Sequence, residues 1–339
     1  MKPIAVLIVF LFMIAFIGCS STSPPSAQIE PEELTVHGDV RVDNYYWLRD
    51  RENPEVIAYL EAENEYAEKV MADTSELQET LFEEIKGRIK PNDESVPVLL
   101  NGYYYYTRFT EGKEYPVYCR RKGSLEAEEE VILDVNEIAG DNEFFSVTGV
   151  TASPDNRMLV YGVDNVGRRR YELRFKDLET GEQLDTVIED VTGRAVWAND
   201  NNTVFYTRKD PETLRAYQVY RQPLDGDAEL VFQEDDVTFS CGVGKSKSRE
   251  YIIIGSSQTL SNEYRYLDAD DPEGEFQVIQ PRERGLEYYA DHLGDYFYIL
   301  TNLDAMNFRL MRAPLDATEK EHWEEVIGHR DDVLLQSFE

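Results

Sequence analysis

Residues 199–232 have the sequence NDNNTVFYTRKDPETLRAYQVYRQPLDGDAELVF, and this stretch decides the fold class. It begins with a turn of asparagine and aspartate, which an apolar strand follows at 203–207. A second strand with aromatic and basic residues comes at 217–221, and a third at 230–232. The same order of a polar turn and short strands recurs four more times from Pro91 onward. The sequence therefore predicts a repeated β-unit.

The repeats follow one another at a nearly constant spacing. In the last four units the second strand ends on a leucine, at Leu178, Leu224, Leu267 and Leu315, and these leucines are 46, 43 and 48 residues apart. A period of about 45 residues with four strands is typical of one β-propeller blade, whereas a β-sandwich shows no such super-period. We therefore predict an all-β fold, an incomplete β-propeller of five four-stranded blades, with a sixth starting at His329.

The segment before Pro91 has a helical pattern instead. Asn53 and Pro54 provide a capping residue and a proline at the first helical position, the order that a helix start prefers. Apolar residues spaced three or four apart then predict a helix that ends near Met71. A second helix is expected to end near Gly87. We assign 41–90 to an N-terminal helical segment and 91–339 to a partial β-propeller domain.

The first residues have the features of an export signal. An apolar run at 4–17 is shorter than the roughly 20 residues of a spanning helix and has the length of a signal-peptide core. It leads into FIGCS, which resembles the lipobox of bacterial lipoproteins, with phenylalanine in the usual place of leucine. We predict a lipoprotein-type signal peptide over 1–19, acylation at Cys19, and a flexible tether over 20–40. An ordinary signal peptide is the alternative.

Composition narrows the function classes. The 67 acidic and 34 basic residues leave a net charge of −33, which excludes a nucleic-acid binder, because such proteins hold polyphosphates with Lys and Arg. Hydrophobic residues make up 42% of the chain, too many for a disordered acidic segment. The acidity favours the approach of cationic peptides. The alternative is that the acidic residues only keep an exported protein soluble.

No catalytic, cofactor-binding or metal-binding motif can be recognised in the sequence. The chain has no G-x-S-x-G motif, and the segment 242–246 resembles a phosphate loop but lacks its first glycine, since Phe239 occupies that position. His322 and His329 are seven residues apart, a spacing that fits no helical metal pair. We predict no catalytic, cofactor-binding or metal-binding residue in this chain, and no cofactor.

Two cysteines lie beyond the signal segment. Cys119 and Cys241 are 122 positions apart in separate strand-like segments. A disulfide is permitted in an oxidising compartment, but a disulfide framework needs several cysteines at close spacing. We therefore expect two buried thiols.

Several stretches resemble the prolyl oligopeptidase family of serine peptidases, and its oligopeptidase B branch in particular. They are DNYYWLRD at 43–50, DNVGRRRY at 164–171, VWAND at 196–200, EYRYLDADDP at 263–272 and NFRL at 307–310. The resemblance implies a seven-bladed propeller inserted near the start of an α/β-hydrolase chain, with the two N-terminal helices packed on the hydrolase. It also implies that the catalytic triad and the acidic pockets that select Arg or Lys lie beyond the propeller. This chain ends at Glu339, so we expect the α/β-hydrolase domain to be absent from it.

Taken with the resemblance, the sequence predicts the substrate-gating propeller of an exported serine oligopeptidase that hydrolyses short peptides after Arg or Lys. The chain alone is expected to be inactive. Its expected partners are short cationic peptides, the hydrolase domain of the same full-length protein and, through Cys19, a bacterial envelope membrane. The alternative is a non-catalytic, lipid-anchored propeller that binds peptides or proteins.

Overall fold

The computed structural model describes residues 23–339, which fall into two units. The first extends to Lys90 and the second begins at Pro91. This boundary coincides with the change from helical to strand pattern in the sequence. No helix in the described part is long and apolar enough to cross a membrane.

The first unit begins with a β-hairpin. Strands β1 (Glu32–Val36) and β2 (Asp39–Asp43) pair antiparallel around His37 and Gly38, which have φ angles of 53° and 83°. Two consecutive residues with positive φ make the type I′ turn that matches the twist of a hairpin. This corrects the expectation of a flexible tether for residues 32–40, because the turn joins two strands of alternating character.

Two helices follow, within the bounds predicted from their sequence signals. They are α1 (Pro54–Met71) and α2 (Ser75–Gly87), and short 3-10 turns lie at Tyr46–Arg49 and Ala72–Thr74. The Asn53 side chain accepts a hydrogen bond of 2.9 Å from the Glu55 amide, which confirms the predicted cap. The apolar stripes of both helices are 44–60% exposed, and they consist of Ile57, Leu60, Val70, Met71, Leu77, Leu81, Phe82 and Ile85. Large apolar side chains exposed in this number are typical of an interaction site.

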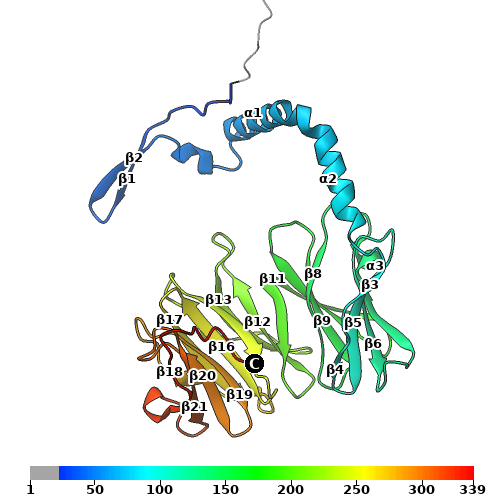
Figure 1. The fold of residues 1–339 in the computed structure, drawn as a ribbon, viewed down its shortest axis with the longest axis vertical. Coiled ribbons are helices and arrows are strands. Elements are labelled where there is room, and N and C mark those ends of the chain that lie inside the picture. The colour runs from blue at the N-terminus through cyan, green and yellow to red at the C-terminus, as the bar shows by residue number, and fades with distance from the viewer. Residues whose placement is uncertain (1–22) are drawn as a thin grey trace, which may run out of the picture. The chain divides into compact units, whose positions relative to one another are not determined.

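The second unit is built from successive antiparallel sheets (Figure 1). The first sheet contains β3 (Asp93–Glu94), β4 (Val98–Leu100), β5 (Tyr103–Phe109), β6 (Val117–Lys122) and β7 (Glu129–Asp134), and a short helix α3 (Val135–Ala139) follows it. The next sheet contains β8 (Ser146–Ala152), β9 (Met158–Asp164), β10 (Tyr171–Asp177), β11 (Gln183–Trp197), β12 (Thr203–Lys209), β13 (Ala216–Pro223) and β14 (Glu229–Gln233).

The two last sheets have four strands each. One contains β15 (Ser240–Lys245), β16 (Tyr251–Gln258), β17 (Ser261–Asp268) and β18 (Gln277–Gln280). The other contains β19 (Tyr288–Leu293), β20 (Tyr296–Thr301), β21 (Arg309–Pro314) and β22 (Glu324–Ile327), with a 3-10 turn at Lys320–His322. The described residues thus make five propeller blades, because the seven-stranded sheet is two blades that share one strand.

The shared strand is β11, which runs through 15 residues, Gln183–Trp197. Its register shifts between Val191 and Ala195, and Gly193 in this bulge has a φ of 86°. The bulge lets the backbones of β8 and β9 approach β11 closely. An added Cβ would lie 2.4 Å from the Gly193 oxygen at Gly149 and 2.3 Å from it at Gly162. Only glycine fits at these two positions, because a Cβ would overlap the backbone of β11.

One row of polar contacts connects each blade to the next. It runs along the turns between the first and second strands and the strand residues beside them, where the sequence places its Asn, Asp and Ser clusters. The contacts are Asn156 Nδ2 to the Asn101 oxygen (2.9 Å), the Asp155 amide to Asn201 Oδ1 (2.8 Å), Lys245 Nζ to the Trp197 oxygen (2.8 Å) and Ser248 Oγ with His292 Nδ1 (2.7 Å). The turn residues therefore fix neighbouring blades to one another as well as reversing the chain.

The predicted start of a sixth blade is not a strand. Residues from His329 to Leu335 contain only an isolated bridge between Arg330 and Val333. The Asn307 side chain donates hydrogen bonds to the Arg330 and Asp331 oxygens, at 3.0 and 2.9 Å. The segment therefore lies against the turn between β20 and β21.

Candidate functional site

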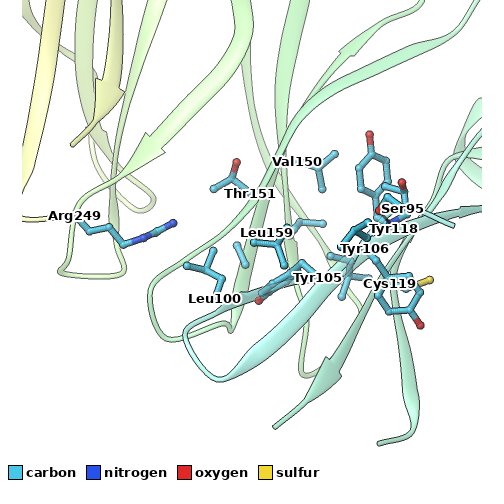
Figure 2. A pocket seen from close by; sticks show the side chains of 15 residues that line it. Ser95, Leu100, Tyr105, Tyr106, Tyr118, Cys119, Val150, Thr151, Leu159 and Arg249 are labelled. Carbon is cyan, nitrogen blue, oxygen red and sulfur yellow. Dashed lines mark hydrogen bonds between the residues drawn. The ribbon is translucent and has the colours of Figure 1, made fainter. Parts of the chain in front are cut away.

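A cavity of about 420 Å³ opens between the first two blades (Figure 2). Strands β4 to β7 form one wall, and β8 and β9 form the other. Its lining is mostly apolar, and it includes Val98, Leu100, Tyr105, Tyr118, Ile132 and Leu159. Val98 and Leu100, two residues apart in β4, line the cavity from the same face of their strand, as the alternation of side chains along a strand requires.

The phenol groups leave this wall apolar. Tyr105 donates a 2.8 Å hydrogen bond to Asn156 Oδ1 in the next blade, so its hydroxyl is already used. Burial raises the pKa of Tyr105 and of Tyr118 above the ordinary value, so both phenols stay neutral. The cavity has no ionisable carboxylate among its lining residues.

One cation reaches this cavity from a distant part of the chain. Arg249 lies in the turn between β15 and β16, and Figure 2 shows its side chain extending toward Leu100. Among the described residues, its guanidinium has no ion pair or hydrogen bond. The wall and the cation are about 150 positions apart, so only the tertiary structure brings them together.

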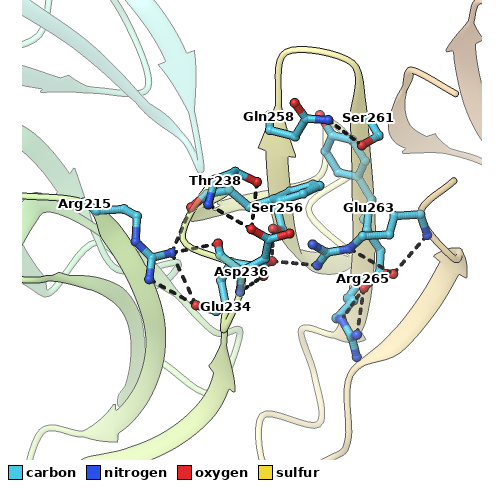
Figure 3. A network of polar contacts seen from close by, with 12 residues as sticks. Arg215, Glu234, Asp236, Thr238, Ser256, Gln258, Ser261, Glu263 and Arg265 are labelled. Carbon is cyan, nitrogen blue, oxygen red and sulfur yellow. Dashed lines mark hydrogen bonds and ion pairs between the residues drawn. The ribbon is translucent and has the colours of Figure 1, made fainter. Parts of the chain in front are cut away.

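A second polar site lies between the third and fourth blades (Figure 3). Arg282 donates to Glu234 Oε2 at 2.6 Å, and Ser256 donates to the same oxygen. Glu263 accepts from Arg265 at 2.7 Å and from the Arg282 amide at 3.1 Å. Both carboxylates are buried, with Glu234 4% exposed and Glu263 7% exposed.

The electrostatics of this cluster favour an ionised Glu234. Burial opposes the charge of Glu234, but the Arg282 ion pair and the Ser256 hydrogen bond outweigh it and hold the pKa of Glu234 below its ordinary value. The Arg282 guanidinium also lies over the Phe239 ring, 4.1 Å from its centroid. Because every charge has a partner, the cluster is a structural ion-pair network that holds two blades together. It is not a pair of catalytic carboxylates.

The structure places a serine and a histidine together that the sequence leaves far apart. Ser248 and His292 are 44 residues apart, and their side chains share the 2.7 Å hydrogen bond between the fourth and fifth blades. His292 is fully buried beneath Tyr251, and its Nε2 has no partner among the described residues. A nucleophile and base need access to substrate, so this pair is structural.

The motifs weighed in the sequence have structural roles. The segment 242–245 lies in strand β15, and the Lys245 ammonium donates to the Trp197 oxygen and to Asn199. Burial lowers the pKa of Lys245 to about 8. In the described residues, no group of three acidic, histidine or cysteine side chains is arranged to hold a metal ion.

The basic run RRRY at 168–171 forms a loop that its own carboxylates organise. Asp164 is buried and accepts hydrogen bonds from the Val166, Gly167 and Arg169 amides, at 2.7–2.9 Å. Arg170 pairs with Asp190 at 2.6 Å. Asp164 therefore holds the loop in one conformation and exposes Arg168 at its tip.

The predicted thiols are confirmed, since Cys119 and Cys241 are both free and buried. The lipidation site predicted at Cys19 lies outside the described residues.

Burial raises the pKa of Cys119 to about 11 and that of Cys241 to about 12. The thiolate is the reactive form, so we expect a Cys19→Ser chain to leave Ellman's reagent unreacted at neutral pH until it unfolds. Addition of urea should then release two equivalents of thiolate product. Rapid reaction of either thiol in the folded chain would contradict this expectation.

Comparison with known proteins identifies the architecture. Residues 24–339 match the family profile described as prolyl oligopeptidase, N-terminal beta-propeller domain. The chain belongs to the prolyl oligopeptidase family. Oligopeptidase B from Leishmania major has a solved structure with a TM-score of 0.86 and 30% identity, over 94% of this chain and 48% of that one. The family resemblance of the sequence is thereby confirmed.

Two curated relatives are similar to this chain over nearly its whole length. Dipeptidyl aminopeptidase BI from Pseudoxanthomonas mexicana is 42% identical over 94% of this chain and 47% of its own length. Protease 2 from Moraxella lacunata is 36% identical, over 93% of this chain and 48% of its own. This prolyl oligopeptidase family chain spans about half the length of the curated relatives it matches.

Proposed function

We propose that this chain is the substrate-gating propeller of an exported serine oligopeptidase that cleaves short peptides after Arg or Lys. The match of residues 24–339 to the propeller domain of a peptidase family carries the proposal. A propeller beside a hydrolase admits to the active centre only peptides that are short or unfolded. The catalytic triad belongs to the α/β-hydrolase domain of the same full-length protein.

Two features support a partner domain and a cationic substrate. The exposed apolar stripes of α1 and α2 have the character of a surface that a hydrolase domain covers. The net charge of −33 attracts cationic peptides over a distance that salt shortens. Substrate preference for Arg or Lys should therefore weaken as ionic strength rises.

The chain by itself is expected to show no peptidase activity. The triad and its oxyanion hole act as one unit, and neither can be assembled from the described side chains. The purified chain should be incubated with arginyl and lysyl amide substrates. Turnover that survives repurification and is blocked by a serine-directed phosphonate would contradict the expectation.

The coding sequence after the Glu339 codon tests the function itself. A downstream G-x-S-x-G supports the peptidase, and the extended product should then cleave arginyl and lysyl peptides faster than leucyl ones. It should also leave folded proteins intact. A stop codon at this place would support the alternative, a non-catalytic propeller that binds peptides or proteins.

Anchoring to an envelope membrane through Cys19 is part of the proposal. Two or more acyl chains hold a protein stably at a membrane, where one does not. Cys19→Ser should move the chain from the membrane pellet to the soluble fraction, and globomycin should block processing of the parent. A variant that still pellets and resists a carbonate wash would show that Cys19 carries no anchor.

A further inference from the structure

The cavity between the first two blades has the size of a binding pocket. Close-packed interiors leave few voids larger than a water molecule, whereas ligand pockets occupy roughly 300–1,000 Å³. Its volume of about 420 Å³ falls in the second class. The lining strands are held in place by the contacts of Tyr105 and Asn101 with Asn156, at 2.8 and 2.9 Å. The cavity is therefore a fixed feature of the blade junction.

Its walls select an apolar group. Leu100, Ile132, Val150 and Leu159 present aliphatic carbons, and the Tyr105 hydroxyl is already occupied by Asn156. A charged or strongly polar side chain placed against these aliphatic carbons would lose more hydrogen bonds to water than it regains. An aromatic or branched aliphatic side chain has no hydrogen bonds to water to lose on entry, and it buries apolar surface.

Arg249 adds a requirement for negative charge beside that apolar group. The chain has 67 acidic residues, and Arg221 in β13, Arg265 in β17 and Arg282 after β18 all pair with carboxylates. Arg249 pairs with none of the described carboxylates, although it lines the cavity. A guanidinium binds a carboxylate through two parallel hydrogen bonds, so a carboxylate is the anion that fits Arg249 best.

We propose that this cavity binds the C-terminal residue of a peptide, with its apolar side chain between the blades and its free carboxylate on Arg249. That the natural ligand is a peptide rests on the proposed function, whereas the site rests on the cavity and the cation. Such binding would orient a peptide by its end. The cationic residue that the acidic surface attracts would then remain free for the hydrolase.

The test uses two small probes that differ only in charge. The Cys19→Ser chain is titrated calorimetrically with N-acetylphenylalanine and with its amide. For a probe of this size we expect a Kd on the order of 1 mM for the acid. The amide should bind at least tenfold more weakly, because it cannot form the charge-assisted pair. Equal binding of acid and amide, or no binding of either, would overturn the proposal.

Variants then locate the site. Arg249→Gln should lower the affinity for the acid to that for the amide and leave amide binding unchanged. Lys247 is exposed in the same turn, as Arg249 is, but it does not line the cavity, so Lys247→Gln removes the same charge and should change neither value. Equal weakening by both substitutions would show general attraction of anions and overturn the proposal.

A cavity-blocking variant provides an independent readout. Val98 is 64% exposed at the edge of the cavity, so Val98→Trp should fold with an unchanged far-ultraviolet spectrum and abolish binding of both probes. Retained binding in a folded Val98→Trp chain would overturn the proposal. No step measures turnover, so an extended gene product that fails to cleave arginyl peptides would refute the proposed function alone.

Discussion

Gly162→Ala is expected to destabilise the propeller unit by about 3 kcal/mol or more. The new Cβ would lie 2.3 Å from the Gly193 oxygen and 2.6 Å from the Gly193 Cα. Both atoms belong to the backbone of β11, the strand that two blades share, so no side-chain rotation relieves the clash. Urea unfolding followed by tryptophan fluorescence and circular dichroism measures the loss.

A matched glycine provides the control for this prediction. Gly242 also lies in a strand with an ordinary φ, and an added Cβ there would meet no atom within 4 Å. Gly242→Ala should therefore stay within about 0.5 kcal/mol of the parent. Equal unfolding midpoints for the two variants would mean that β9 and β11 are not in close backbone contact.

Arg282→Met should cost about 3–5 kcal/mol at neutral pH, because it leaves the buried Glu234 carboxylate without its cation. Glu234 would retain only the Ser256 hydroxyl and the Asp236 amide. Glu263 would keep its pair with Arg265. Removing one partner of a buried pair is more costly than removing both, so Glu234→Gln in the same chain should recover much of the loss.

The pH dependence of this loss identifies its cause. In the parent, the pKa of Glu234 lies below its ordinary value, so its contribution to stability is present at neutral pH and is lost as pH falls through the folded pKa. Without Arg282 only the Ser256 and Asp236 hydrogen bonds oppose the effect of burial on the pKa of Glu234, so the carboxyl takes up a proton more readily. The destabilisation by Arg282→Met should therefore shrink between pH 7 and about pH 5.

An exposed pair is the control for the buried one. Arg157 and Glu179 lie 2.9 Å apart, with side chains 57% and 61% exposed. Arg157→Met should cost less than about 1 kcal/mol, with little dependence on pH. If Arg282→Met costs no more than this, or costs the same at both pH values, Glu234 is not a buried unpaired charge in the variant.

Local signals in the sequence were enough for the elements that depend on neighbouring residues. The helix from Pro54 to Met71 follows from its asparagine cap, its proline and its apolar spacing, all of which act within a few residues. The strands Tyr103–Phe109 and Tyr296–Thr301 follow from turn residues and β-branched or aromatic runs. Repetition of that pattern about every 45 residues was sufficient for the propeller.

The same signals missed what depends on pairing. Strands β8, β15 and β19 open their blades with weak patterns such as SCGVGK, and become strands because a neighbouring strand supplies hydrogen bonds. Strand β11 extends through two blades because bulges absorb its change of direction. The segment after His329 has a strand-like sequence but forms no strand.

The sequence by itself therefore determined the class of fold, the helices, the blade repeat and the family. Each of these depends on short-range spacing or on stretches of residues that resemble the family. Only the tertiary structure decided which residues meet: Arg249 at a cavity formed near Leu100, Arg282 between Glu234 and Glu263, and Ser248 with His292. These contacts join positions 19 to about 150 residues apart. Blade stacking creates them, and no local pattern encodes which faces of two blades will touch.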